Sequence, residues 1–137
     1  MDATEGYVVV YPEAVGQTWN ATEDGPDVTW LRSVVAEVEA NHCIDPSHVH
    51  AVGHSMGAHM VQRLACDAND VFASLAEYAG GPTTLAAGWG GCAPDRPSSI
   101  AVYHGTADPL VPISLGRTSR DQWLRDSAAP PRLRRPR

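Results

Sequence analysis

Hydrophobic residues along the chain form short clusters of two alternating kinds. Some clusters are runs rich in β-branched and aromatic residues, with the length and composition of buried strands. Between them, apolar residues recur three and four positions apart, which is the period of an amphipathic helix. Strands are therefore expected at 7–11, 49–52, 71–79 and 99–103, and helices at 27–41, 56–66 and 113–124.

This alternation predicts an α/β fold with a mostly parallel sheet and helices on both of its faces. The segments at 12–26 and 83–97 contain Gly, Pro, Asn or Asp without periodicity, so they are expected to be loops. Asp24 or Asp27 is expected to cap the first helix. Because crossover connections are right-handed, the carboxyl ends of parallel strands meet at one edge of the sheet, where α/β active sites form.

The second expected strand leads into the most informative stretch of the chain, Gly53-His54-Ser55-Met56-Gly57. A strand, a sharp turn and a helix around G-x-S-x-G form a nucleophile elbow, so Ser55 is the candidate nucleophile. Two backbones pass close together in this turn, and a Cβ atom at Gly53 or Gly57 is expected to clash. The N–H of Met56 lies at the N-terminus of the next helix and is the candidate oxyanion donor.

A nucleophilic serine needs a base, and the base in turn needs an orienting carboxylate. After an elbow of this kind the chain order is serine, then acid, then histidine. Asp108 follows the strand at 99–103, in a loop that Gly105 opens and Pro112 closes. An aspartate in such a loop is also typical of a simple turn, but its place in the chain order favours the triad acid.

The six histidines provide no evident base. No histidine follows His104, and that residue is expected to pack or to form a hydrogen bond beneath the loop of Asp108. The side chain of His54 should leave the elbow in another direction, and His59 lies one turn along the following helix. The loop that normally supplies a second oxyanion donor has no counterpart before the elbow either. No function is assigned to the other three, His42, His48 and His50.

Charge is distributed unevenly over the chain, whose net charge is −6. Residues 1–115 hold 14 acidic residues and 3 arginines, whereas residues 116–137 hold 2 aspartates and 7 arginines, and the chain contains no lysine. An acidic body argues against nucleic acid as a partner. No apolar run is long enough to span a membrane, and no C-x-x-C motif or Cys/His cluster indicates a metal or another cofactor.

The charge distribution divides the chain into an α/β body at 1–115 and a basic, Arg/Pro-rich tail at 116–137. The last ten residues contain three prolines and four arginines but one large apolar residue, so this part of the tail is expected to be disordered. Contact of the arginines at 132–137 with an anionic partner is the weaker alternative.

Several motifs together resemble the polyhydroxybutyrate depolymerase and feruloyl esterase group of secreted α/β-hydrolases. The most specific is the block at 104–112, HGTADPLVP, because G-x-S-x-G alone occurs throughout hydrolases. The resemblance runs from about Tyr7 to Ser114, so residues 1–115 are expected to be the central part of a larger α/β-hydrolase domain. The remaining motifs are Tyr11-Pro12, Trp19-Asn20, Asp27-Val28, Ile44-Asp45-Pro46, Leu64-Ala65-Cys66 and Cys92-Ala93-Pro94.

The resemblance implies a serine esterase that forms an acyl-enzyme on Ser55, with Asp108 as the triad acid and the Met56 N–H as one oxyanion donor. Substrates of the family are polyester oligomers or aromatic esters on plant cell-wall sugars, so the expected partner is a small or polymeric ester. The family's N-terminal strands, oxyanion loop and C-terminal histidine have no counterpart in this sequence. A catalytically impaired remnant, or a non-catalytic binding domain with the same fold, is therefore the alternative.

The resemblance also concerns the cysteines, the location and the gene. Cys66 and Cys92 fall at positions where the family tends to carry cysteines, so a disulfide between them is a hypothesis. The family is extracellular, whereas residues 1–6 lack the features of a signal peptide, so an extracellular and a cytoplasmic location both stay open. The Arg/Pro-rich tail has the composition that a shifted reading frame of a GC-rich gene encodes, and we expect a truncated or frameshifted gene product.

Overall fold

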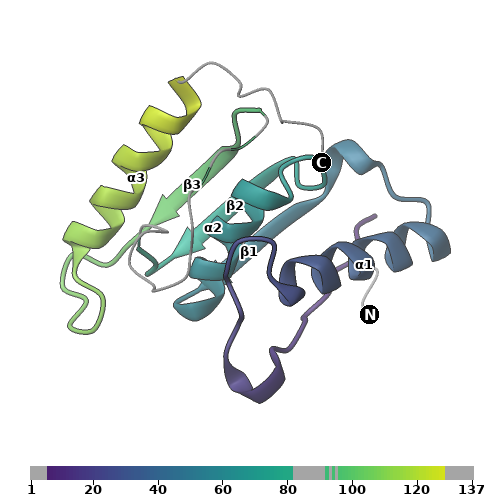
Figure 1. Ribbon diagram of the computed structural model, residues 1–137, viewed down its shortest axis with the longest axis horizontal. Helices are drawn as coiled ribbons and strands as arrows, with labels where there is room; N and C mark the ends of the chain where they lie inside the picture. Colours follow the sequence, from purple (N-terminus) through teal and green to yellow (C-terminus); the bar gives the residue numbers. More distant parts are fainter. Residues whose placement is uncertain (1–5, 82–91, 93, 95, 129–137) are drawn as a thin grey trace.

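The computed structural model describes residues 6–81, 92, 94 and 96–128; the end of the tail and most of the loop expected at 83–97 lie outside them (Figure 1). Strands and helices alternate in the described residues as the sequence predicts. The strands are β1 (His50–His54), β2 (Ser74–Tyr78) and β3 (Ser99–Tyr103). The helices are α1 (Pro26–Asn41), α2 (Met56–Asp67) and α3 (Ile113–Ala128), with 3-10 turns η1 (Val15–Gln17) and η2 (Pro46–His48).

The three strands form one parallel sheet in the order β1-β2-β3, which confirms the α/β class. Both pairings are in register, so that His54, Tyr78 and Tyr103 lie side by side at the carboxyl ends of the strands. Ser55 follows β1 directly and Asp108 follows β3 after a short connection. Both candidate residues therefore belong to segments that leave the carboxyl edge of the sheet.

Residues 7–11, expected to form a strand, do not join the sheet. Tyr11 is 89% exposed, and with Val10 it lines a shallow surface pocket beside Trp30 and Val34 of α1. The β-branched composition of this run favours an extended backbone, but a strand also needs a neighbour for its N–H and C=O groups. The strand prediction was wrong because composition does not reveal whether a neighbour exists.

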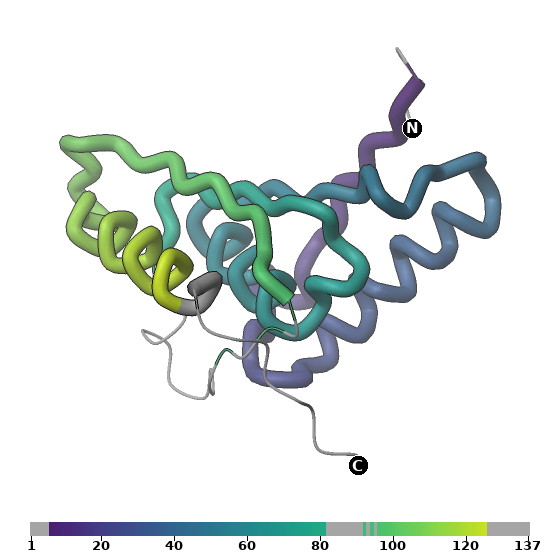
Figure 2. Tube along the Cα trace, turned by 90° about the horizontal axis from the view of Figure 1, so that it is seen from above, coloured from purple at the N-terminus to yellow at the C-terminus, as the bar shows by residue number. Residues whose placement is uncertain are grey.

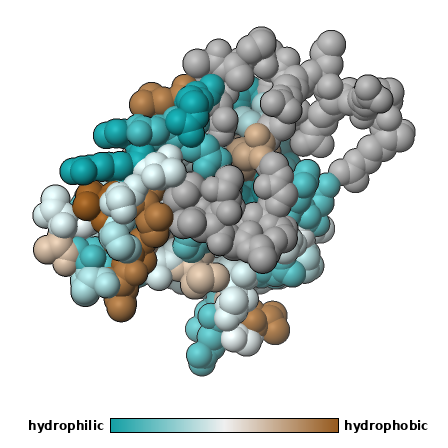
Figure 3. All heavy atoms as spheres, turned by 60° about the vertical axis from the view of Figure 1, so that its left-hand side comes forward, coloured by the Kyte–Doolittle hydropathy of each residue, from teal (hydrophilic) through white to brown (hydrophobic). Residues whose placement is uncertain are grey.

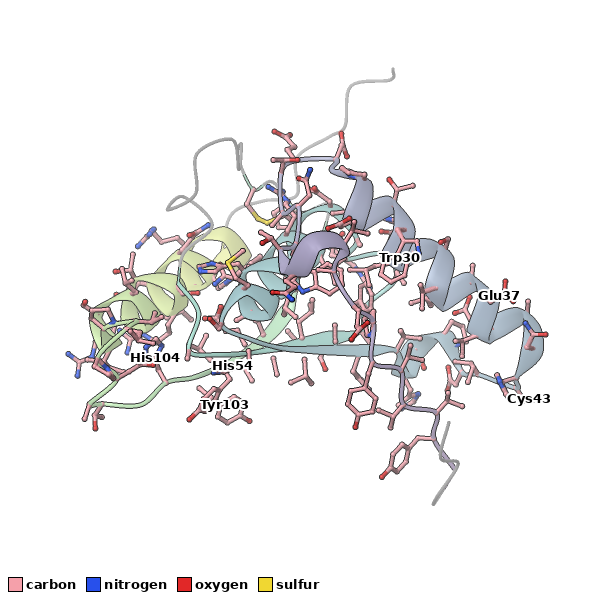
Figure 4. All side chains as sticks on the ribbon, turned by 90° about the horizontal axis from the view of Figure 1, so that it is seen from below. Trp30, Glu37, Cys43, His54, Tyr103 and His104 are labelled. Carbon is pink, nitrogen blue, oxygen red and sulfur yellow. A yellow bond between two sulfur atoms is a disulfide. The ribbon has the colours of Figure 1, made fainter. Side chains whose placement is uncertain are left out.

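All three helices lie on one face of the sheet in the described part of the chain (Figures 2 and 4). α2 packs on β1 and β2, α3 packs on β3, and α1 contacts α2. The other face is open: Val52 is 79% exposed, and Tyr103, which points away from the helices in Figure 4, is 58% exposed. Helices on both faces were expected, but right-handed connections that advance in one direction along the sheet place their helices on one face. Coverage of both faces requires a reversal of strand order, which the described strands do not contain.

The hydrophobic core lies between the sheet and α2. Met60, Val61 and Leu64 of α2 are buried, as the helical pattern predicts. Trp123 of α3 is 3% exposed and belongs to the same core cluster. The boundary expected between residues 115 and 116 therefore falls within a helix that packs on the body of the protein.

The start of α1 differs from the expected aspartate cap. Gly25 occupies the N-cap position, and no side chain forms a capping hydrogen bond there. The backbone N–H of Asp24 instead donates to the carboxylate of Asp67 at 2.9 Å, and Asp27 accepts from the backbone N–H of Asn20 at 2.7 Å. Both aspartates thus fix the preceding loop rather than the helix end.

The side of the molecule that carries α3 and the loop before it shows polar and apolar surface together (Figure 3). Leu110 in this loop is 88% exposed, and Leu124 on α3 is 64% exposed. Single exposed leucines are ordinary on soluble surfaces, so they do not by themselves indicate an interface. No helix among the described residues is long and apolar enough to cross a membrane.

Candidate active site

Ser55 alone makes the turn between β1 and α2. Its backbone has φ 53° and ψ −116°, a conformation that residues with a Cβ atom rarely adopt. The Ser55 N–H donates to the carbonyl of Tyr78 at 3.0 Å, and the Ser55 carbonyl accepts from Ala58 and His59 at 3.0 and 3.2 Å. Hydrogen bonds to β2 and to α2 therefore hold the strained residue in place, as an elbow requires.

The glycines of the elbow do not have equal roles. A Cβ atom added at Gly53 would lie 2.1 Å from the carbonyl oxygen of Gly57, so the expected close approach of two backbones is present. A Cβ atom at Gly57 would meet no other atom within 4 Å. The prediction of a clash at Gly57 is therefore wrong. The main chain of Gly57 lies against Gly53, but a side chain at position 57 would point into open space.

Met56 is the first residue of α2. The first N–H groups of a helix have no acceptor inside the helix and carry the positive end of its dipole. The Met56 N–H, directly after Ser55, is therefore available to an anion formed beside the serine. Its role as oxyanion donor stays a prediction.

Asp108 is held by the loop that it begins. Its Oδ1 atom accepts from the backbone N–H groups of Leu110 and Val111, both at 2.9 Å. The hydrogen bond from Val111, then that from Leu110, lowers the pKa of the Asp108 carboxyl, and the nearby His104 and His54 lower it further. Asp108 therefore has the turn-forming role that was the alternative, and this does not conflict with a second role as triad acid.

The histidines near the elbow are positioned differently from a triad base. The ring of His54 lies against Tyr78 on the open face of the sheet, with ring centroids 5.4 Å apart. His59 is half-buried on α2, and burial lowers the pKa of its imidazole. Within residues 6–81, 92, 94 and 96–128, no histidine forms a hydrogen bond with the hydroxyl of Ser55 or the carboxylate of Asp108.

His104 is half-buried and forms a hydrogen bond beneath the Asp108 loop, as predicted. Its Nε2–H donates to the carbonyl of Val111 at 2.7 Å. A Cβ atom at Gly116 of α3 would lie 2.6 Å from Nδ1, so α3 packs directly on the imidazole. Figure 4 shows His104 and His54 at the same end of the sheet, far from Cys43.

Glu77 is a residue of this region that the sequence analysis missed. It lies on β2 and is 1% exposed, with the side-chain amide of Gln62 donating to its Oε2 atom. Burial raises the pKa of its carboxyl, and the neighbouring polar groups of Ser119, Gln62 and His104 oppose this rise. The available signal was an acidic residue in the middle of an otherwise apolar strand.

The expected disulfide is present between Cys66 and Cys92, whose Cα atoms are 5.2 Å apart. Cys66 lies in the last turn of α2, and Cys92 lies in the connection between β2 and β3. Cys43 is free and exposed. The disulfide attaches the long connection to the helix that the elbow begins.

A strained serine between a parallel strand and a helix is the local geometry of the elbow found in proteins with the alpha/beta hydrolase fold. A sequence model described as the alpha/beta hydrolase family matches residues 3–137. The chain therefore belongs to the alpha/beta hydrolase family.

Curated proteins similar to this chain are esterases and a depolymerase. Feruloyl esterase D of Neurospora crassa is 28% identical over 131 residues, 96% of this chain and 43% of that protein. Feruloyl esterase B of Piromyces equi is 32% identical over 82% of this chain and 22% of that protein. Poly(3-hydroxyalkanoate) depolymerase C of Paucimonas lemoignei is 31% identical over 79% of this chain and 35% of that protein. The chain spans less than half the length of these relatives, which confirm the resemblance seen in its motifs.

Proposed function

We propose that this chain carries the nucleophile and the acid of a serine esterase, a carboxylic-ester hydrolase of the polyhydroxybutyrate depolymerase and feruloyl esterase type. The observation that carries the proposal is the backbone of Ser55, held at φ 53° and ψ −116° after β1. Strain of this kind is costly and persists where the surrounding structure enforces it, most often at functional sites. It supports a serine whose hydroxyl is presented to a substrate.

In the proposed reaction the Ser55 hydroxyl oxygen attacks the carbonyl carbon of an ester while a base removes its proton. The carbonyl oxygen becomes an oxyanion, which the Met56 N–H stabilises. The intermediate then expels the alcohol, which takes up the proton, and an acyl group remains on Ser55. Water attacks this acyl-enzyme in the same way and releases the acid.

The fixed orientation of the Asp108 carboxylate supports the role of this residue as triad acid. Its Oδ1 atom is occupied by two backbone N–H groups, whereas Oδ2 accepts no hydrogen bond from the described residues. The second oxygen is thus available to orient an imidazole, as the acid does in a serine triad. Its ionisation is secured by the lowered pKa of the carboxyl.

A catalytically impaired or non-catalytic domain is the second candidate. It is favoured by the lack of a hydrogen bond from any described histidine to Ser55 or Asp108. Removing a triad member from a serine hydrolase lowers its rate by roughly 10⁴-fold or more. The two candidates therefore differ greatly in the turnover they predict.

The similarity to feruloyl esterases and a poly(3-hydroxyalkanoate) depolymerase supports an ester substrate, small or polymeric. We infer that the substrate class is a polyester oligomer or an aromatic ester. An extracellular location is part of the same proposal, because the group that the motifs resemble is secreted.

Hydrolysis of p-nitrophenyl butyrate by the purified chain tests the proposed function. Ser55→Ala removes the nucleophile, and Ser74→Ala, a serine at the amino end of β2, is the matched control. We expect turnover by the wild type and by Ser74→Ala, and none above background by Ser55→Ala. Equal rates for all three proteins would favour the non-catalytic candidate.

A further inference from the structure

A buried carboxyl lies on β2, the strand between the two that lead to Ser55 and Asp108. Glu77 is 1% exposed, and Gln62 of α2 donates both to its Oε2 atom and to the carbonyl of Gly81. A Cβ atom at Gly80 would lie 2.8 Å from that of Ala58 and 3.1 Å from Glu77 Oε2. The carboxyl is therefore packed beneath the first turns of the helix that begins at the elbow.

The same carboxyl faces the strand that leads to Asp108. Glu77 pairs in register with Val102 of β3. Side chains two residues apart along a strand point to the same face, so His104 follows Val102 on the helix-covered side. Contact of the His104 ring with Gly116 of α3 agrees with this placement. The imidazole thus lies diagonally across from the Glu77 carboxyl, and the Glu77 Oε1 and His104 Nδ1 atoms are both buried without a hydrogen-bond partner among the described residues.

From His104 a chain of hydrogen bonds continues to Asp108. The His104 Nε2–H donates to the carbonyl of Val111 at 2.7 Å. The N–H of the same residue, Val111, donates to Asp108 Oδ1 at 2.9 Å. Any shift of the imidazole therefore moves the peptide that orients the carboxylate.

We propose that Glu77 is a positioning residue, whose buried carboxyl orients the His104 imidazole across the two strands and through it the Val111 peptide and the Asp108 carboxylate. Its contacts with Gln62 also tie this chain to the elbow helix. The proposal rests on the proposed function in assigning Asp108 to the catalytic site. The coupling of Glu77 to the Asp108 loop is a separate physical claim that can be measured without a substrate.

A purely space-filling role explains the position poorly. Burial of a carboxyl costs free energy unless partners compensate, and an apolar side chain of similar volume fills a core at lower cost. The polar groups near Glu77 come from three elements: Gln62 on α2, which donates to it, Ser119 on α3 and His104 after β3. These elements include α2, which begins after Ser55, and β3, which leads to Asp108.

Glu77→Gln tests the proposal because it keeps the shape of the side chain and removes its charge. The matched control is Glu39→Gln, which removes a charge from an exposed position on α1. The readouts are the ¹⁵N signals of the His104 ring and the amide exchange rates of Leu110 and Val111 in the full chain. We expect the ring signals to move and the two amides to exchange about tenfold faster in Glu77→Gln, with neither change in Glu39→Gln.

His104→Leu, which removes the Nε2–H donor to the Val111 carbonyl, tests the same coupling from its other end and keeps the proposal testable should Glu77→Gln not fold. We expect the same loss of protection at Leu110 and Val111. A folded Glu77→Gln with unchanged ring signals and unchanged exchange overturns the proposal, as does unchanged exchange in His104→Leu. If the two variants change the exchange of Leu110 and Val111 but the chain shows no Ser55-dependent ester hydrolysis, this inference is retained and the proposed function is refuted.

Discussion

At the scale of single residues, the elbow depends on one close contact between glycines. An alanine at position 53 brings its Cβ atom to 2.1 Å from the carbonyl oxygen of Gly57, whereas an alanine at position 57 meets open space. We expect Gly53→Ala to lower the free energy of unfolding by about 1–3 kcal/mol or more. Gly57→Ala lies within a helix and should leave it unchanged or raise it by up to about 1 kcal/mol. Urea denaturation measures both, and an equal loss in the two variants would contradict this account of the turn.

The buried carboxyl of Glu77 makes stability depend on pH. Burial raises the pKa of this carboxyl in the folded chain. As the pH rises, the unfolded chain therefore loses the proton first, at about pH 4.3 as for an ordinary glutamate. The stability that protonated Glu77 contributes is therefore present below about pH 4 and is lost as the pH rises through the folded pKa. The free energy of unfolding of Glu77→Gln should fall less than that of the wild type between about pH 4 and pH 8. Parallel curves for the two proteins would contradict the raised pKa.

Asp108 changes the stability of the chain with pH in the opposite direction to Glu77 and in a separate pH range. Its pKa is lowered by the hydrogen bonds of Val111 and Leu110, so the stability it contributes is present above the unfolded value of about 3.9. That contribution is lost only as the pH falls through the folded pKa. The comparison of wild type with Glu77→Gln above about pH 4 is therefore free of the Asp108 effect.

Local motifs explain which site residues the sequence could predict. The positions of Ser55 and Met56 follow from a strand, a five-residue motif and a helix, all contiguous in the chain. Asp108 could be found because its loop follows a recognisable strand. Glu77 could be noticed as an acidic residue in an apolar strand, but its surroundings could not be predicted, because α2, β3 and α3 meet around it and no local pattern encodes that meeting.

At the scale of elements, the disulfide is the main covalent link between α2 and the connection that follows β2. Cys66 and Cys92 are separated by 26 positions, and closing a loop of this size typically adds about 2–4 kcal/mol to stability. We expect reductant to lower the melting temperature of the wild type and not that of Cys66→Ala. Cys43→Ala should melt like the wild type with and without reductant. A melting temperature that does not respond to reductant would show that the disulfide contributes little.

The elements themselves were predicted to different degrees. β3 matches the expected strand at 99–103, and α1 and α2 agree with expectation to within a residue or two, because their signals are local periodicity and composition. The segment at 7–11 has equally strong composition but pairs with nothing in the described sheet. Pairing is a property of two segments, so one segment's sequence cannot decide it.

At the scale of the whole molecule, the open face of the sheet should make the chain associate. Val52 is 79% exposed, and β1 has no neighbour on its outer side among the described strands. Unpaired edges and apolar faces favour contact between copies. Sedimentation velocity should show concentration-dependent association that Val52→Lys reduces and Leu110→Lys, at an exposed leucine on the α3 side, does not. A monomer at all concentrations that melts cooperatively would contradict this expectation.

The central claim is that the elbow presents Ser55 as a nucleophile. Its most direct test is to trap the acyl-enzyme: the chain is mixed with p-nitrophenyl butyrate, quenched in acid and digested, and the peptide that contains residue 55 is examined by mass spectrometry. The account predicts one butyryl group on Ser55 of the wild type and no acylation of that peptide in Ser55→Ala. Absence of the adduct from the wild-type peptide, or its presence on the same peptide in Ser55→Ala, would contradict it.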